Sequence, residues 1–164
     1  MIDNIDREIL NIIQKDARIS NAEIARQVEL APSAVLERVR KLEERGVIRG
    51  YSADIDPKVL GFGLTAIIAI RTSECGEGVG EQLAAVPEVQ EVHEVAGEDC
   101  FYIKVRTQDT ESLGALLRGK LKAIPNVVFT RTTVVLKTFK EGSNLPVELE
   151  ADGSEDLKRK ARGK

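Results

Sequence analysis

Basic side chains gather in one short stretch of an otherwise acidic chain. The 164 residues carry a formal net charge of −3. Phosphate groups of nucleic acids respond to local positive charge, whatever the total charge of the protein. Between residues 31 and 49 the local charge is +2 (5 − 3), from Arg38, Arg40, Lys41, Arg45 and Arg49 against Glu37, Glu43 and Glu44. The stretch therefore permits nucleic-acid binding, and a merely solvated charged face is the alternative interpretation.

The segment Gly97-Glu98-Asp99-Cys100 is the second place where the residue types can do chemistry. A glycine followed by two acids, between two apolar segments, offers backbone N–H groups and carboxylates at one turn. Such a turn can hold the carboxylate and the ammonium group of an amino acid, because charged groups strengthen hydrogen bonds. A plain hairpin turn without a ligand is the alternative interpretation.

Catalytic and metal-binding patterns are missing from the sequence. His93 is the only histidine, and Cys75 and Cys100 are the only cysteines. A structural zinc site needs about four such ligands, and no nucleophile lies at a spacing that would pair it with His93. We therefore expect no enzyme activity, no metal and no cofactor, and we expect both cysteines to be reduced. The start of the chain has no signal-peptide pattern, and no apolar run approaches the roughly 20 residues that cross a bilayer. We expect a cytoplasmic protein without a membrane partner.

The basic stretch has to be positioned by helices, and three are predicted before residue 47. The first starts at the capping residue Asp3 or Asn4, the second at Ser20, where Glu23 completes a capping box, and Pro32 opens the third. Apolar residues recur on one face of each helix: Ile5, Ile9, Ile12 and Ile13, then Ile24, Ala25 and Val28, then Val35, Val39 and Leu42. A short helix followed by a longer one with a basic outer face is typical of the helix-turn-helix, whose second helix enters the major groove. Residues 47–53 then form a short extended wing.

The second half alternates strands and helices. Strands are predicted at 64–70, 89–96, 101–106 and 127–139, with helices between the first and second strands and between the third and fourth. The order β-α-β-β-α-β indicates a ferredoxin-like domain, with a four-stranded antiparallel sheet covered by two helices on one face. Because the strand at 64–70 is apolar at nearly every position, we expect a second copy of the sheet to cover the other face in a homodimer.

The ordered part of the sequence, roughly residues 2 to 140, resembles the Lrp/AsnC family of transcription regulators. The resemblance rests on Ala31–Phe62 (APSAVLERVRKLEERGVIRGYSADIDPKVLGF), on Ile5–Leu10 and on Val95–Gly97. It implies a sequence-specific regulator of transcription that binds pseudo-palindromic double-stranded DNA. It also implies dimers that assemble into tetramers or octamers, and an amino-acid effector that modulates assembly and DNA binding.

The resemblance also implies the residues of both sites. The DNA-binding set is Ser20, Asn21, Pro32, Ser33, Ala34, Glu37, Arg38, Arg40, Lys41 and Arg49. The effector-binding set is Gly97, Glu98, Asp99 and Cys100, together with Thr132 and Thr133. Three positions depart from the family pattern: Glu29 stands where glycine is usual, Ala31 where a serine cap is usual, and Cys100 where many members have aspartate.

The fold class is therefore α+β, with four regions along the chain. Residues 1–50 are predicted to form the helix-turn-helix domain, 51–63 the wing and linker, 64–140 the effector-binding and oligomerisation domain, and 141–164 a disordered tail. Two alternative functions stay open. One is an architectural DNA-binding protein without an effector, favoured by Cys100. The other is a small-molecule binding or assembly protein without specific DNA binding.

Overall fold

The computed structural model describes residues 2–73 and 78–150 and divides them into two compact units. The helical unit contains the chain up to Asp54 and the segment that begins at Gly142, and the sheet unit is Ile55–Glu141. Each unit has its own hydrophobic core. Within the described ranges, no helix combines the length and the apolar character that crossing a membrane requires.

The helical unit contains α1 (Asn4–Lys15), α2 (Asn21–Gln27) and α3 (Pro32–Glu44). The apolar faces predicted from spacing form its core, with these buried residues: Ile9, Ile24, Ala25, Val28, Val35, Val39 and Leu42. Asp3 caps α1 in a full capping box with Asp6. Ser20 caps α2 by accepting a hydrogen bond from the Glu23 N–H, but the reciprocal bond expected from Glu23 is absent, since that carboxylate contacts Arg26 instead.

The turn between α2 and α3 is built on a left-handed residue. Glu29 has φ +52°, at the position where the resemblance led us to expect glycine. A left-handed conformation costs a residue with a Cβ about 1–2 kcal/mol. The Leu30 N–H donates to the Ala25 carbonyl at 3.0 Å, so the turn keeps a backbone hydrogen bond. α3 then begins after Ala31, which makes no side-chain cap.

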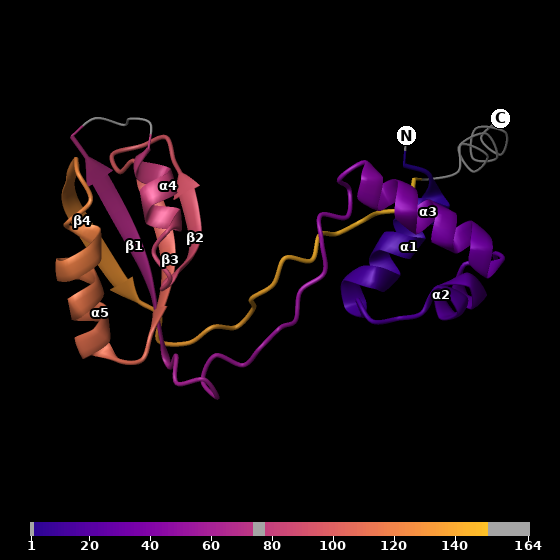
Figure 1. Cartoon of the computed structure of the whole chain (residues 1–164), viewed down its shortest axis with the longest axis horizontal. Coiled ribbons are helices and arrows are strands. Elements are labelled where there is room, and N and C mark those ends of the chain that lie inside the picture. The colour runs from indigo at the N-terminus through magenta and orange to yellow at the C-terminus, as the bar shows by residue number, and fades with distance from the viewer. Residues whose placement is uncertain (1, 74–77, 151–164) are drawn as a thin grey trace, which may run out of the picture. The chain divides into compact units, whose positions relative to one another are not determined.

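The sheet unit contains β1 (Leu64–Thr72), α4 (Val79–Ala84), β2 (Val89–Glu94), β3 (Phe101–Thr107), α5 (Thr110–Leu116) and β4 (Val127–Val134), and α5 runs on into a π-helical turn at Leu117–Leu121. The strand order is β2-β3-β1-β4 and every pair is antiparallel. Both helices pack on one face of the sheet, on a core that includes Ile68, Ile103 and Leu83 (Figure 1). This is the predicted βαββαβ architecture.

Several predictions differ from the structure. β2 ends at Glu94 rather than at 96. β4 ends at Val134 rather than at 139. Val134 pairs with Ala66 near the start of β1, and after one more hydrogen bond, from Val135 N–H to the Thr65 carbonyl, β1 provides no further partner.

The segment from 141 was expected to be disordered, yet residues 144–150 form an ordered set of hydrogen bonds with α1. Residues 151–164 of the predicted tail lie outside the described residues.

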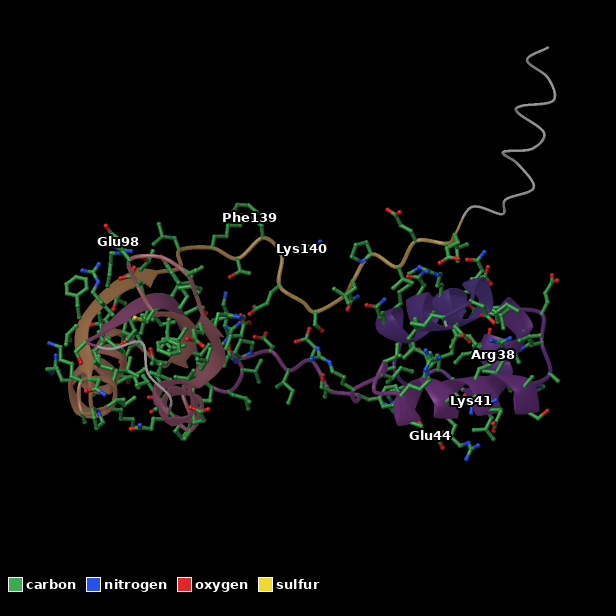
Figure 2. The ribbon with its side chains drawn as sticks, turned by 90° about the horizontal axis from the view of Figure 1, so that it is seen from above. Arg38, Lys41, Glu44, Glu98, Phe139 and Lys140 are labelled. Carbon is green, nitrogen blue, oxygen red and sulfur yellow. The ribbon has the colours of Figure 1, made fainter. Side chains whose placement is uncertain are left out.

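The face of the sheet turned away from α4 and α5, here called the free face, mixes apolar and charged side chains. Alternation along the strands places on it Ile67, Ala69, Arg71, Tyr102, Lys104, Arg106, Phe129, Arg131 and Thr133. At one end of this face Lys104 and Arg106 both bind the carboxylate of Glu141, Arg106 at 2.6 Å. The connector after β4 exposes Phe139 and Lys140 (Figure 2).

Candidate DNA interface and effector site

The outer face of α3 (Ser33, Ala34, Glu37, Arg40 and Lys41) is exposed along its whole length. The buried residues Val35, Val39 and Leu42 hold the opposite side of the helix on the core. Pro32 is also exposed and stands at the first position of the helix, so the amino-terminal end of α3 presents only small side chains. A helix of this kind can approach base edges without steric obstruction.

The charges on the outer face of α3 are paired with one another. Arg40 lies 3.1 Å from Glu37 and 3.2 Å from Glu44, and Lys41 lies 3.3 Å from Glu37. Hydrogen bonds from Arg40 and then from Lys41 hold the pKa of Glu37 below its ordinary value. Both cations are more than half exposed, and exposed pairs of this kind contribute little to stability. Phosphate oxygens can therefore replace these carboxylates at small cost.

Arg38 behaves differently from its neighbours on α3. Its guanidinium (Arg38 is labelled in Figure 2) lies 2.7 Å from Asp3, the N-cap of α1, and 2.7 Å from Asp6 in the first turn of that helix. The two carboxylates, Asp3 first, raise the pKa of the Arg38 guanidinium above its ordinary value. Sequence reasoning assigned Arg38 to the DNA, proposed Asp3 or Asn4 as the helix cap, and placed Asp6 on the water-facing side of the first helix, whereas Asp6 is buried. The structure brings all three together as a link between α1 and α3.

The remaining DNA-binding candidates lie on other elements. Ser20 is exposed at the start of α2, and its hydroxyl is used as the helix cap. Asn21 is half-buried beside it. Arg49 is exposed in the segment 47–53, which forms no strand. That segment is attached to α3 by Tyr51, whose hydroxyl donates to the carboxylate of Glu43 at 2.8 Å.

The turn 97–100 connects β2 to β3, as the sequence predicts. Gly97 and Glu98 are exposed, whereas Asp99 and Cys100 are buried. The backbone of Cys100 continues the sheet, because its N–H donates to the Ile70 carbonyl and its carbonyl accepts from Val95 N–H, both at 2.9 Å. Cys100 is disulfide-bonded, so the expectation of a reduced thiol at this position was wrong.

Asp99 is the centre of a charged cluster at this turn. Its side chain is only 3% exposed and lies 2.7 Å from Arg131 of β4 and 3.5 Å from Arg71 of β1. Arg71 also donates to the backbone carbonyl of Glu98 at 3.0 Å and lies 5.7 Å from the centre of the Phe129 ring. One Asp99 oxygen, Oδ1, has no hydrogen-bond partner. The cluster thus combines two guanidinium groups, two carboxylates and an aromatic ring, the groups that recognise a zwitterion.

Sequence reasoning missed Arg71, Phe129 and Arg131. They belong to two strands that flank the turn only after the sheet has formed, so no spacing along the chain connects them to Asp99. The two predicted threonines are separated by the pleat. Thr133 lies on the same face of the sheet as Arg131, whereas Thr132, opposite Ile68, lies on the helix-covered face.

A helix-turn-helix unit joined to a sheet unit with a charged turn defines a DNA-binding transcription regulator with a ligand-binding domain. Comparison with known families agrees for both units. Residues 2–49 match the winged helix-turn-helix DNA-binding model, and residues 65–145 match the Lrp/AsnC ligand binding domain. The chain belongs to the Lrp/AsnC family of transcription regulators.

Individual relatives cover nearly the whole chain. The HTH-type transcriptional regulator FL11 of Pyrococcus horikoshii is 39% identical over 149 residues, which are 90% of this chain and 97% of the relative. The leucine-responsive regulatory protein of Escherichia coli K12 is 38% identical over 151 residues, 90% of this chain and 92% of the relative.

Solved structures of similar proteins share the fold. The feast or famine regulatory protein of Mycobacterium tuberculosis complexed with L-methionine superposes with a TM-score of 0.83 at 34% identity, covering 90% of this chain and 100% of that one. Escherichia coli AsnC superposes with a TM-score of 0.80 at 30% identity, covering 89% and 99%. A Neisseria meningitidis transcriptional regulator in complex with L-Met has a TM-score of 0.85 at 27% identity, covering 89% and 97%.

Proposed function

We propose that this regulator binds double-stranded DNA through the outer face of α3 and responds to an amino acid bound at the turn 97–100. The observation that carries the first half is the small, exposed amino-terminal end of α3 followed by exposed cations. Ser33, Ala34 and Glu37 face the base edges, and Arg40 and Lys41 exchange their carboxylate partners for phosphates. Ser20, Asn21 and Arg49 contact the DNA backbone beside them.

Arg38 has a positioning role in this proposal. Its contacts with Asp3 and Asp6 fix the angle of α3 on α1, and hence the direction from which α3 enters the groove. Removing its side chain weakens binding through a misplaced helix rather than through a lost base contact.

The effector site is the charged cluster around Asp99. The positive charges of Arg71 and Arg131 suit the carboxylate of an amino acid. The negative charges of Asp99 and Glu98 suit its ammonium group. Both solved L-methionine complexes described above support an amino acid as the ligand class. Gly97 and Thr133 border the cluster, and Cys100 supports it from within the sheet.

The free face of the sheet is the proposed dimer interface. Ile67, Tyr102 and Phe129 lie there without a covering helix, and Tyr102 and Phe129 are among the exposed large apolar residues. Burying apolar side chains in an interface is a main driving force for association. In a two-fold dimer this face meets its own copy, and two α3 helices then reach successive major grooves. Further assembly to tetramers or octamers is proposed from the family alone.

The test is a titration of fluorescently labelled DNA from upstream of the protein's own gene. A Kd of about 10⁻⁸ M or tighter, falling steeply with added salt, is expected of a specific regulator. Lys41→Ala should reduce affinity, whereas Lys15→Ala, an exposed lysine on α1, should not. Weak binding that ignores sequence would overturn the DNA half of the proposal.

The effector half has a separate test. The same titration is repeated with each amino acid, and calorimetry measures binding of L-methionine first. A changed Kd with one amino acid identifies the effector. Unchanged DNA binding and no heat with any amino acid would favour an architectural protein without an effector.

A further inference from the structure

Residues 144–150, here called the C-terminal strap, run in an extended conformation along α1. Their partners are four polar side chains of α1 at helical spacing, here called the polar stripe: Asn4, Arg7, Asn11 and Gln14. Residues spaced by three or four lie on one face of a helix, so the polar stripe is a continuous track. Neither the DNA interface nor the effector site uses it.

The residue at each end of the polar stripe forms hydrogen bonds with both the N–H and the carbonyl of one strap residue. Gln14 accepts from the Leu145 N–H at 2.7 Å and donates to the Leu145 carbonyl at 3.2 Å. Asn4 accepts from the Glu150 N–H at 2.8 Å and donates to the Glu150 carbonyl at 3.0 Å. A side-chain amide used in this way reproduces the pairing of a neighbouring β-strand.

The middle of the polar stripe follows the same rule. Asn11 donates to the Val147 carbonyl at 2.8 Å, and Arg7 donates to the Glu148 carbonyl at 3.0 Å. Two contacts involve side chains of the strap: the ion pair of Arg7 with Glu150, and the contact of Asn144 with the end of α1. The other hydrogen bonds between the polar stripe and the strap are made with main-chain atoms of the strap. Recognition therefore depends on an extended backbone more than on the strap's side chains.

The dimensions of the two partners agree. Asn4 and Gln14 are ten residues apart, or about 15 Å along a helix axis. Leu145 and Glu150 are five residues apart, or about 16 Å in an extended chain. Pro146 has no N–H that would need a partner, and it favours an extended conformation for Leu145 before it. Glu150 lies at the amino-terminal end of α1, where the helix dipole favours negative charge. The negative charge of Glu150 thus favours a strap that runs antiparallel to α1.

We propose that the polar stripe of α1 is a receptor for an extended main chain, and that its occupant is the C-terminal strap of the same chain. The strap is thereby a second attachment of the chain to the helical unit, which the chain leaves after Asp54 and rejoins at Gly142. Asn4 and Arg7 are interleaved with Asp3 and Asp6, which hold Arg38, so the strap docks where α1 anchors α3.

The experiment is hydrogen exchange of single backbone amides in the full-length protein. The Leu145 and Glu150 amides should exchange about tenfold or more slowly than an unstructured chain, because each donates a hydrogen bond. Gln14→Ala should restore fast exchange at Leu145, and Asn4→Ala should restore it at Glu150. Lys15→Ala, on the same helix but outside the polar stripe, should change neither. Alanine has a higher helix propensity than asparagine, glutamine or lysine, so these substitutions do not weaken α1 itself.

A triple variant tests the main-chain rule. Leu145→Ser, Val147→Ser and Leu149→Ser together should leave both amides protected. Loss of protection in this variant would show recognition through side chains and overturn the proposal, as would fast exchange of both amides in the unmodified protein. A photo-crosslinking residue at Val147 should capture α1 within one chain. A crosslinked band of twice the chain mass would overturn the assignment to the same chain.

Discussion

Arg38 of α3 and Asp6 of α1 form an ion pair at 2.7 Å, and the Asp6 side chain is only 11% exposed. Asp6 also completes the capping box of α1, so one carboxylate serves both the start of α1 and the placement of α3. Any change at Arg38 therefore alters the packing of the helical unit before it alters a contact with DNA.

Arg38→Ala should lower the free energy of unfolding by about 1–3 kcal/mol, because it leaves a largely buried carboxylate without its charged partner. Urea denaturation measures this, and Arg40→Ala is the matched control, since Arg40 is exposed and should cost less than about 0.5 kcal/mol. DNA affinity should fall in both variants. Wild-type stability in Arg38→Ala would contradict the positioning role.

Glu141 makes a pH-dependent contribution to the sheet unit. Hydrogen bonds from Lys104 and then Arg106 hold its pKa below the ordinary value of 4.5. A carboxyl group whose pKa is depressed by folding stabilises the protein above its unfolded pKa, and the contribution disappears as the pH falls through the folded pKa. Glu141→Gln should therefore be less stable than the wild type at pH 6, and the difference should close below pH 4.5. Glu111→Gln is the exposed control, and a stability difference that does not shrink as the pH falls below 4.5 would contradict the assignment.

Glu29→Gly should stabilise the helical unit by about 1 kcal/mol. Glu29 has φ +52°, which glycine adopts without the clash of a Cβ. Asn126→Gly is the matched comparison, since Asn126 has φ +71° and asparagine tolerates this conformation better than glutamate does. A thermal or urea melt compares the two gains. A loss of stability in Glu29→Gly would show that the flexibility of unfolded glycine outweighs the relieved strain.

Arg131→Ala should affect both stability and effector response. It removes the 2.7 Å partner of Asp99, whose side chain is 3% exposed, and should cost about 1–3 kcal/mol. Glu98→Gln keeps the fold because Glu98 is exposed, and it should weaken amino-acid binding alone. Calorimetry with the identified effector, next to urea denaturation, separates the two effects. Full effector affinity in Arg131→Ala would place the ligand elsewhere.

The sequence was sufficient for the elements whose signal is local. Apolar spacing and the caps Asp3 and Ser20 predicted the three helices, and the alternation from Phe101 to Arg106 predicted β3. Interactions between distant residues were not predictable. Arg38 is separated from Asp3 by 35 residues, and Arg131 is separated from Asp99 by 32. The end of β4 depended on where β1 begins, which the sequence of β4 does not contain.

The C-terminal strap illustrates a different limit. Its partners on α1 bind carbonyl and N–H groups, which every residue except proline offers alike, so the strap has no sequence signature. Composition alone therefore suggested disorder. The only trace in the sequence is on the other side of the contact, where polar residues recur along one face of α1.

Recognition through the backbone also determines how freely α1 and the C-terminal strap can change in sequence. Between Asn144 and Glu150, whose side chains also contact α1, substitutions leave the bonded main-chain atoms of the strap in place. These inner positions can therefore vary in sequence while the strap stays docked. Asn4, Arg7, Asn11 and Gln14 have no such freedom, because each bond starts from the side chain itself. Among relatives that share the contact, the polar stripe of α1 should therefore be more conserved than the strap. A hybrid protein with the first 54 residues of one relative and the remaining residues of another should still form the contact.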